Sequence, residues 1–337
     1  MIRIALAANA FSPSPDTWMR LAGQPLAIDV VLDGLVPFRS PSGLPTVPVV
    51  ALRRLTPPVT PTWRSTGSSS LGSWDLAYSA SFDPHSGYTI DLAPGLRLRV
   101  TADGQDVALD HPCAFNLDDP AIAQSILGPG LLLALALQGC FAFHASAAAL
   151  GERAAVFLGD SGAGKSTLAA DLDQRRADGW QRLADDVLPV APAADGGLDA
   201  WPEFPQLKLA AEAQYVAGGA RPERVPVAAI YLLEAFSVPV AEAVAPPTVP
   251  SAAVAPAAPV VPAAAAVTIS TVSPRDAMLA LVAHTMAGRL FAPDLAARHF
   301  AFCAAVAAAV PLKRLRYPRR LEALDAVAQA LAADLAL

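Results

Sequence analysis

The N-terminal third of the chain alternates short hydrophobic or β-branched runs with turn residues, a pattern typical of β-strands. Pro94-Gly95 supplies turn chemistry between two of these runs. The stretch from Pro57 to Ser73 is rich in Pro, Ser, Thr and Gly, which predicts a mobile loop. We therefore expect a small, mostly β domain over residues 1–112, with strands at its start and at 27–32, 88–92, 96–100 and 106–109.

From residue 113 onward the pattern changes to helices alternating with strands, which predicts an α/β domain over 113–337. Its first segment, Ala121 to Phe143, carries no charge and is long enough to cross a bilayer. Gly128-Pro129-Gly130 interrupts this segment, so we interpret it as a buried helix followed by a central strand.

The remaining hydrophobic periodicity predicts both element types. Strands are expected at 141–150, 154–158, 187–190, 207–215, 228–233 and 312–316, and helices at 164–175, 273–287, 294–310 and 321–335. Ser273-Pro274-Arg275-Asp276 predicts a helix start, with Ser273 as the cap. Residues 237–265 consist almost entirely of Ala, Val and Pro, which predicts a disordered or polyproline-like insertion in the second domain.

Composition narrows the class of protein. The chain is 54% hydrophobic, which is enough to fill a large core. Its net charge of −6 argues against the basic surface expected of a general nucleic-acid binder. Cys113, Cys140 and Cys303 are an odd, widely spaced set without a CxxC pair, so the sequence indicates neither a disulfide framework nor a zinc site. We expect a cytoplasmic protein without a membrane span.

A glycine-rich stretch between an expected strand and an expected helix satisfies the P-loop pattern G-x-x-x-x-G-K-[ST]. Such glycines let backbone N–H groups converge on phosphates, Lys165 adds a positive charge, and the Ser166 hydroxyl can bind Mg²⁺. The nucleotide-binding residues expected from this motif are Gly159, Asp160, Ser161, Gly162, Ala163, Gly164, Lys165, Ser166 and Thr167.

Two carboxylates follow the expected P-loop helix, and one histidine precedes the loop. Asp185 and Asp186 adjoin an apolar strand, where one carboxylate can hold Mg²⁺ while the other accepts a hydroxyl proton. The alternative interpretation is a surface turn with two solvated aspartates. His144 lies in an apolar strand 21 residues before Lys165, from which it can reach the aspartates, although a lone histidine there is more often a core residue.

The combination of His144, Gly159 to Ser166 and Ala184-Asp185-Asp186 resembles the catalytic domain of the HPr serine kinase/phosphorylase family. The segment 315–324, Leu-Arg-Tyr-Pro-Arg-Arg-Leu-Glu-Ala-Leu, is similar to shorter HPr-kinase-related proteins, some of which accompany lasso peptide and other peptide-modification systems. The resemblance implies a P-loop domain of the phosphoenolpyruvate-carboxykinase-like type, ATP and Mg²⁺ as cofactors, and a serine hydroxyl as acceptor.

The resemblance also implies a role for each residue. Asp185 would be the catalytic base, His144 would support Asp185, and Ser166 and Asp186 would bind Mg²⁺. Thr167 stands where the HPr enzymes usually have Glu, and Ala145 where they commonly have Gly. The sequence lacks the C-terminal signature linked to HPr recognition and phosphorolysis, so the resemblance extends neither to HPr as substrate nor to the reverse reaction.

The leading hypothesis is thus an ATP-dependent serine kinase acting on a peptide or protein, with a ribosomally made peptide precursor as the first candidate acceptor. A nucleotide-binding sensor or scaffold without transfer and a small-molecule hydroxyl kinase stay open, as does a homo-oligomer. His284 and Arg289 could reach an acceptor, and Lys208 is a weaker candidate. The default explanation for all three is that they are ordinary exposed polar residues. His85, His111 and His299 give no functional signal.

Overall fold

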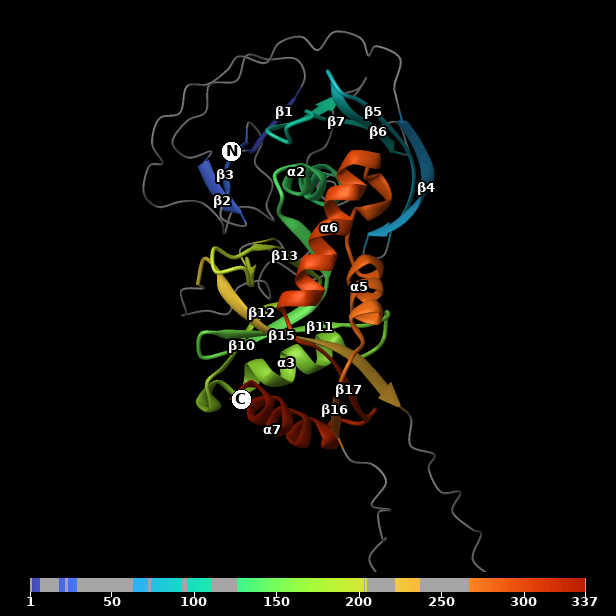
Figure 1. Cartoon of the computed structure of the whole chain (residues 1–337). Helices are drawn as coiled ribbons and strands as arrows, with labels where there is room; N and C mark the ends of the chain where they lie inside the picture. The colour runs from blue at the N-terminus through green and yellow to red at the C-terminus, as the bar shows by residue number, and fades with distance from the viewer. Residues whose placement is uncertain are drawn as a thin grey trace, which may run out of the picture.

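The computed structural model describes residues 2–6, 18–21, 24–28, 63–71, 74–92, 96–110, 126–202, 204, 222–236 and 267–336. Within these ranges the chain is a mixed α/β protein with two sheets, which Figure 1 shows at different levels of the molecule. The expected domain boundary near 112, Cys113, the segment 207–215 with Lys208, and the insertion 237–265 all lie outside the described residues.

The N-terminal sheet has eight strands in the order β2-β3-β1-β8-β7-β6-β5-β4. Every pairing is antiparallel except those of β1, which runs parallel to both neighbours. The strands are β1 Ile2–Leu6, β2 Trp18–Leu21, β3 Gln24–Ile28, β4 Trp63–Leu71, β5 Trp74–Asp83, β6 Gly87–Leu92, β7 Leu96–Val100 and β8 Asp106–Asp110.

The expected strands β6, β7 and β8 are confirmed, but the loop expected from Pro57 to Ser73 is wrong over most of its length. Residues Trp63–Leu71 form β4, a nine-residue strand that pairs with β5 from Trp63↔Phe82 to Leu71↔Trp74. Backbone pairing with a neighbouring strand thus outweighs the low strand propensity of the Gly-Ser run in this segment.

The charge-free segment after the first sheet enters the protein core. A π-helical turn, Ile126–Gly130, leads into α2, Leu131–Leu137, whose first six residues are all buried. The strand that follows, β9 Phe141–His144, stands at the end of its sheet rather than at the centre, contrary to our expectation. Of the helices in the part of the chain that the structure describes, none is long and apolar enough to cross a membrane.

The second sheet has nine strands in the order β12-β10-β11-β15-β14-β13-β9, with β17 also pairing β15, and β16 pairing β17. The expected single strand 141–150 is two strands, β9 and β10, because the chain turns at Ala145, whose N–H donates to the carbonyl of Asp186 at 3.2 Å. The other strands are β10 Ser146–Leu150, β11 Arg153–Leu158, β12 Trp180–Ala184, β13 Val187–Pro192, β14 Leu198–Ala200, β15 Val225–Phe236, β16 Thr268–Thr271 and β17 Leu312–Pro318.

Helices cover both faces of this sheet (Figure 1). On one face, α3 and α7 pack on β11, β15 and β17 through a cluster that includes the fully buried Phe157, Leu168 and Tyr231. On the other, α5 and α6 lie toward the N-terminal sheet. The helices are α3 Lys165–Gln174, α5 Pro274–Ala283, α6 Pro293–Ala309 and α7 Leu324–Leu335, with short 3₁₀ turns at Arg176–Asp178, Gly288–Leu290 and Leu321–Ala323.

The expected cap of α5 is confirmed, because the Ser273 hydroxyl accepts a hydrogen bond from the N–H of Asp276 at 3.2 Å. The helix ends at Ala283, four residues before the expected position. This shorter helix leaves the residues after it free to form a turn, and that turn reaches the functional site described next.

The N-terminal sheet packs on the helices of the second half of the chain. One core cluster contains Ile90 and Leu98 of the sheet together with Leu131 of α2 and Leu295 of α6. The buried hydroxyl of Tyr88 accepts a hydrogen bond from the N–H of Ala292 at 2.9 Å, just before α6 begins. Each fully buried side chain of leucine or isoleucine size contributes about 1.5–3 kcal/mol to the packing of the sheet on these helices. The sheet is therefore held in a definite position relative to the second half of the chain.

Candidate active site

The glycine loop, residues 159–164, connects buried β11 to the start of α3. Leu158 before the loop is fully buried, and Leu168 in the first turns of α3 is fully buried as well, so both ends of the loop are fixed. Gly164 has φ of 95°, and a Cβ there would lie 2.8 Å from the Tyr317 hydroxyl oxygen. Glycine at this position therefore permits both the left-handed turn and the close approach of Tyr317.

Lys165 is the first residue of α3, and only 6% of it is exposed. Its Nζ donates to the carbonyl oxygens of Gly159 at 2.6 Å and Asp160 at 3.2 Å. The ammonium group thus lies across the loop, next to the backbone N–H groups at the start of the helix. Positive charge and helix N-terminus together form an environment suited to phosphate oxygens.

The two aspartates lie in the connection between β12 and β13 and differ in burial. Asp186 is 3% exposed, whereas Asp185 is half-buried. His144 pairs with Val187 across β9 and β13, and this register places His144 Nδ1 3.2 Å from Asp186 Oδ1. The two atoms are at ion-pair distance but do not meet the geometry of a hydrogen bond. The structure therefore places the histidine against Asp186, not against Asp185 as the resemblance implied.

Asp185 is held by Ser146, a residue that sequence reasoning missed. The fully buried Ser146 hydroxyl lies 3.1 Å from both the carboxylate Oδ1 and the backbone carbonyl of Asp185. Ser146 stands two residues after His144, at the start of β10, so the bend at Ala145 sends one residue toward each aspartate. A serine inside an otherwise apolar strand was the available sequence signal.

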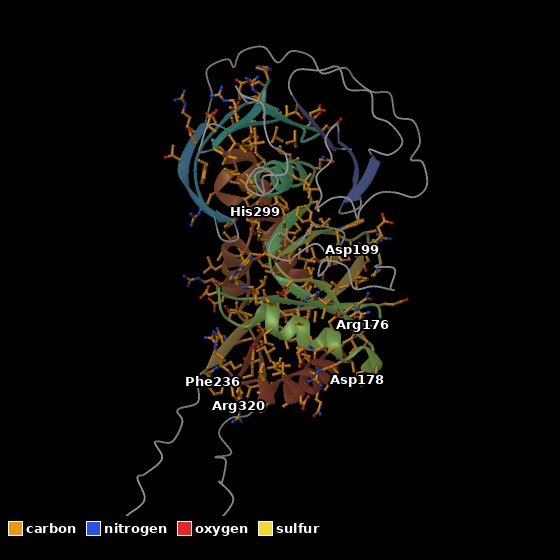
Figure 2. All side chains as sticks on the ribbon, turned by 180° about the vertical axis from the view of Figure 1, so that it is seen from behind. Arg176, Asp178, Asp199, Phe236, His299 and Arg320 are labelled. Atoms are coloured by element: carbon orange, nitrogen blue, oxygen red, sulfur yellow. The ribbon has the colours of Figure 1, made fainter. Side chains whose placement is uncertain are left out.

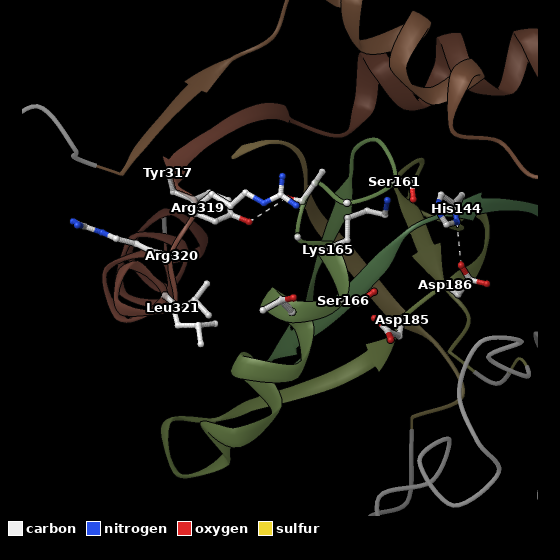
Figure 3. Close-up of a pocket in the computed structure, with 15 residues that line it drawn as sticks. His144, Ser161, Lys165, Ser166, Asp185, Asp186, Tyr317, Arg319, Arg320 and Leu321 are labelled. Carbon is white, nitrogen blue, oxygen red and sulfur yellow. Dashed lines mark hydrogen bonds and ion pairs between the residues drawn. The ribbon is translucent and has the colours of Figure 1, made fainter. Parts of the chain in front are cut away.

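These residues surround a cavity of about 400 Å³. Figure 3 shows His144, Asp186 and Ser161 at one side of it, Lys165 and Ser166 in the middle near Asp185, and the residues that follow β17 at the opposite side. The lining contains His144, Ser161 to Thr167, Asp185, Asp186, Tyr317, Arg319, Arg320, Leu321 and Leu324. The structure thus brings the expected loop residues from Ser161 onward, the lysine, the histidine and both aspartates to one cavity, whereas Gly159 and Asp160 line the neighbouring cavity.

The end of β17 and the residues after it form a second part of the cavity that sequence reasoning did not assign. The Tyr317 hydroxyl donates to the carbonyl of Ala163 in the loop at 3.4 Å, and burial raises the pKa of Tyr317 above its usual range. The N–H of Arg319 donates to the carbonyl of Phe236 at 2.8 Å, which fixes the turn between β17 and α7. Figure 2 shows Phe236 and Arg320 together at the end of the molecule farthest from the N-terminal sheet.

A second cavity of about 450 Å³ meets the first one at His144, Ser161 and Asp186. His284 and Arg289 both line the second cavity, where His284 is half-buried and Arg289 is exposed. The carbonyl of His284 accepts from the N–H of His144 at 2.7 Å. Burial lowers the pKa of His284, and the nearby positive charge of Lys165 lowers that pKa further.

The oxygen donors at the site are suited to magnesium held in part by phosphate and water. The exposed hydroxyl of Ser166 and the two carboxylates are hard oxygen ligands of the kind that Mg²⁺ prefers. Across the described ranges, no group of three or more His, Cys, Asp and Glu side chains is placed to hold a metal ion by itself. That donor set fits an ion that keeps several waters and binds together with a phosphate-bearing substrate.

Comparisons with known proteins give a weak structural similarity. No family model matches the chain, and no curated protein matches it by sequence. Among solved structures, the HPr(Ser) kinase/phosphatase of Coxiella burnetii matches with a TM-score of 0.28 and 11% identity, covering 57% of this chain and 91% of that chain. A match at this level establishes neither the family nor the function of this chain.

Proposed function

We propose that the chain is a Mg²⁺-ATP-dependent kinase that transfers the γ-phosphoryl group to a serine hydroxyl of a peptide or protein. One observation carries the proposal: a glycine loop with a buried lysine lines the same cavity of about 400 Å³ as a buried carboxylate paired with a half-buried histidine. Phosphoryl transfer needs a group that neutralises phosphate charge and a group that accepts the hydroxyl proton, and both are present within this cavity.

In this proposal the nucleotide lies lengthwise in the first cavity. The N–H groups of the glycine loop and the Lys165 ammonium bind the outer phosphates, and Arg319 adds a positive charge beside the loop near Gly162. Leu321 and Leu324 lie at the opposite side, where they offer an apolar surface for the base. Leu321 is 71% exposed, a high value for a leucine, and a bound base would cover it.

Magnesium would be held by Ser166 and Asp185. The hydroxyl lies at the exposed start of α3, and Asp185 is oriented by its contact with Ser146. When bound, the ion neutralises charge that develops on the phosphates during transfer.

Asp186 would accept the proton of the attacking hydroxyl, because Asp186 and His144 lie where the two cavities meet. His144 would orient the carboxylate and share its charge. This assignment exchanges the roles that the sequence resemblance implied for Asp185 and Asp186. The leading acceptor class, a ribosomally made peptide precursor such as a lasso peptide precursor, rests on that resemblance alone.

The two assignments can be separated with matched variants. Asp186→Asn should abolish transfer and leave the affinity for Mg²⁺-ATP within about twofold, because the proton acceptor contributes to the transition state rather than to binding. Asp185→Asn should instead raise the Mg²⁺ concentration needed for half-maximal activity. Asp178→Asn, on an exposed turn away from the cavity, is the control. The opposite pattern would restore Asp185 as the base.

The activity itself is tested by intact-mass analysis of a peptide encoded beside the gene, incubated with the protein and Mg²⁺-ATP. Gain of one phosphoryl group that maps to a serine is the expected result. Lys165→Ala should abolish both this product and ATP binding. Normal ATP binding by Lys165→Ala would refute the nucleotide site, and tight ATP binding without any phosphorylated product would favour a sensor over a kinase.

A further inference from the structure

The second cavity lies between the N-terminal sheet and the turn that follows α5. Tyr78 of β5 and Ile90 and Leu92 of β6 contribute an apolar wall, and each of them is less than 10% exposed, at 7%, 0% and 5%. Pro129, before α2, extends that wall, and Leu132 on α2 continues it. A strand pair more than fifty residues before the glycine loop therefore forms part of a cavity that ends at the loop.

The opposite wall is the turn of residues 284–290, which is attached to β9. The N–H of Met286 donates to the carbonyl of Ala142 at 2.8 Å, and Phe143 forms a β-bridge with Thr285. Ala287 in this turn has φ of 58°, and it is the one non-glycine residue with positive φ among those the structure describes. Left-handed backbone at a non-glycine residue costs about 1–2 kcal/mol, so tertiary contacts hold the turn in this shape.

The polar groups of the second cavity lie at the end that meets the first cavity and along the turn wall, which contributes His284, Thr285 and Arg289. Gly159, Asp160, Ser161, His144 and Asp186 line this end, whereas the wall formed by the N-terminal sheet is apolar. A molecule in the second cavity would thus present a polar group to the proposed phosphate site and an apolar group to the sheet. Its volume of about 450 Å³ is at the lower end of the range for small-ligand sites, about 300–1,000 Å³.

We propose that the second cavity is the acceptor site and that this cavity selects a primary hydroxyl carried next to an apolar group. The inference rests on the kinase function proposed above. The N-terminal sheet then contributes to substrate choice, because its side chains contact that apolar group. Both a seryl residue with apolar neighbours and a free alcohol with an apolar substituent have this chemistry.

The transfer step balances with the groups present. The acceptor O–H gives its proton to the Asp186 carboxylate, and the hydroxyl oxygen forms a bond to the γ-phosphorus. The bond between the γ-phosphorus and the oxygen that bridges it to the β-phosphate breaks, and ADP leaves with that electron pair. His284, whose pKa is lowered, stays neutral near pH 7 and adds no charge next to the acceptor.

The test uses a panel of acceptors and the full-length protein with Mg²⁺-ATP. N-acetylated tripeptide amides Leu-Ser-Leu, Gly-Ser-Gly and Glu-Ser-Glu form one arm, and 3-methylbutan-1-ol and 2-phenylethanol form the other. Filling an apolar part of a binding site distinguishes ligands by about tenfold or more. We therefore expect the leucine peptide or the apolar alcohols to be phosphorylated at least about tenfold faster than the glycine and glutamate peptides.

Two variants should obstruct the second cavity without changing the first cavity, where the nucleotide is proposed to bind. Ala283 is exposed and lines the cavity, so Ala283→Trp should cover its mouth and lower transfer at least about tenfold while ATP affinity changes by less than about twofold. Gly288→Leu does the same from the turn, where a Cβ would lie 3.9 Å from Thr285 and is therefore tolerated. Leu279→Trp, also on α5 and 55% exposed but outside the cavity, is the control.

Each outcome has one consequence. Transfer that is lost in both cavity variants and kept in Leu279→Trp supports the acceptor site, and the more active arm of the panel identifies the source of the hydroxyl. Transfer that is unaffected in both variants, equal rates across the panel, or a preference for the glutamate peptide would overturn the inference. A wild-type chain that binds ATP yet phosphorylates no member of the panel would also overturn it, whereas a wild-type chain that does not bind ATP would refute the kinase function itself.

Discussion

Gly164 lies at the end of the glycine loop, and substitution of this residue tests how the loop is held. Gly164→Ala requires an alanine at φ of 95° and places its Cβ 2.8 Å from the Tyr317 hydroxyl oxygen. The left-handed backbone costs about 1–2 kcal/mol. Displacing a buried tyrosine costs about 1–3 kcal/mol more. Lower entropy of the unfolded chain offsets about 0.4–1 kcal/mol, which leaves a net loss of about 1–4.5 kcal/mol in the free energy of unfolding.

A double-mutant cycle separates the two costs. Tyr317→Phe removes the hydroxyl, and its own cost should be about 0.5 kcal/mol, because the bond to Ala163 is long at 3.4 Å. In the Tyr317→Phe background, Gly164→Ala should lose only the backbone term, so the coupling free energy should be about 1–3 kcal/mol. Gly139→Ala is a matched control, since Gly139 has φ of 88° but no atom within 4 Å of its would-be Cβ.

Urea unfolding followed by circular dichroism measures the free energies, and competition with a fluorescent ATP analogue measures binding. A coupling energy near zero would refute the idea that the Tyr317 hydroxyl limits the space at Gly164. A loss below about 0.5 kcal/mol for Gly164→Ala alone would show that the loop does not need the left-handed conformation.

Three further predictions concern the nucleotide and the core. Leu321→Ala should weaken ATP binding about fivefold to tenfold but leave inorganic tripolyphosphate binding unchanged, because only the base would cover this side chain, and Glu322→Ala should alter neither. Lys165→Met should weaken both ligands at least about tenfold in the same competition assay, because it removes a charged donor to phosphate. Burial lowers the pKa of His299 below its usual value of about 6.5, so the contribution of His299 to stability should be constant above that pH and should fall as pH drops below it, by at most about 1.4 kcal/mol per pH unit. Thermal unfolding of His299→Phe and the unchanged protein over this pH range should show a weaker pH dependence in the variant.

The elements that bear the nucleotide motif could be read from the sequence because their signals are local. An apolar strand, a glycine loop and a helix follow one another within about twenty residues, and β11 and α3 appear where this pattern predicts them. The cap at Ser273 is equally local, since the cap and its partner are three residues apart.

What the sequence could not predict depends on pairing between distant segments. The Gly-Ser run of β4 has low strand propensity and is a strand because β5 offers a partner for it. His144 meets Asp186 because β9 pairs with β13 in a register that places His144 opposite Val187, and a shift by one residue would turn His144 to the other face. The second cavity combines β5, β6 and the turn after α5, which no local pattern connects.

The ends of β15 and β16 have a consequence for the length of the chain between them. Phe236 pairs with Pro318 on one side of β17, and Thr268 pairs with Arg316 on the other side. The two ends are therefore about two strand spacings apart, roughly 10 Å, plus a small offset along the strand. A connection of about six residues is enough to join them, at about 3.3–3.6 Å per residue. The register of β15, β17 and β16 therefore requires only a short connection at this junction, so we expect the junction to accept connections of different lengths, including an inserted binding domain.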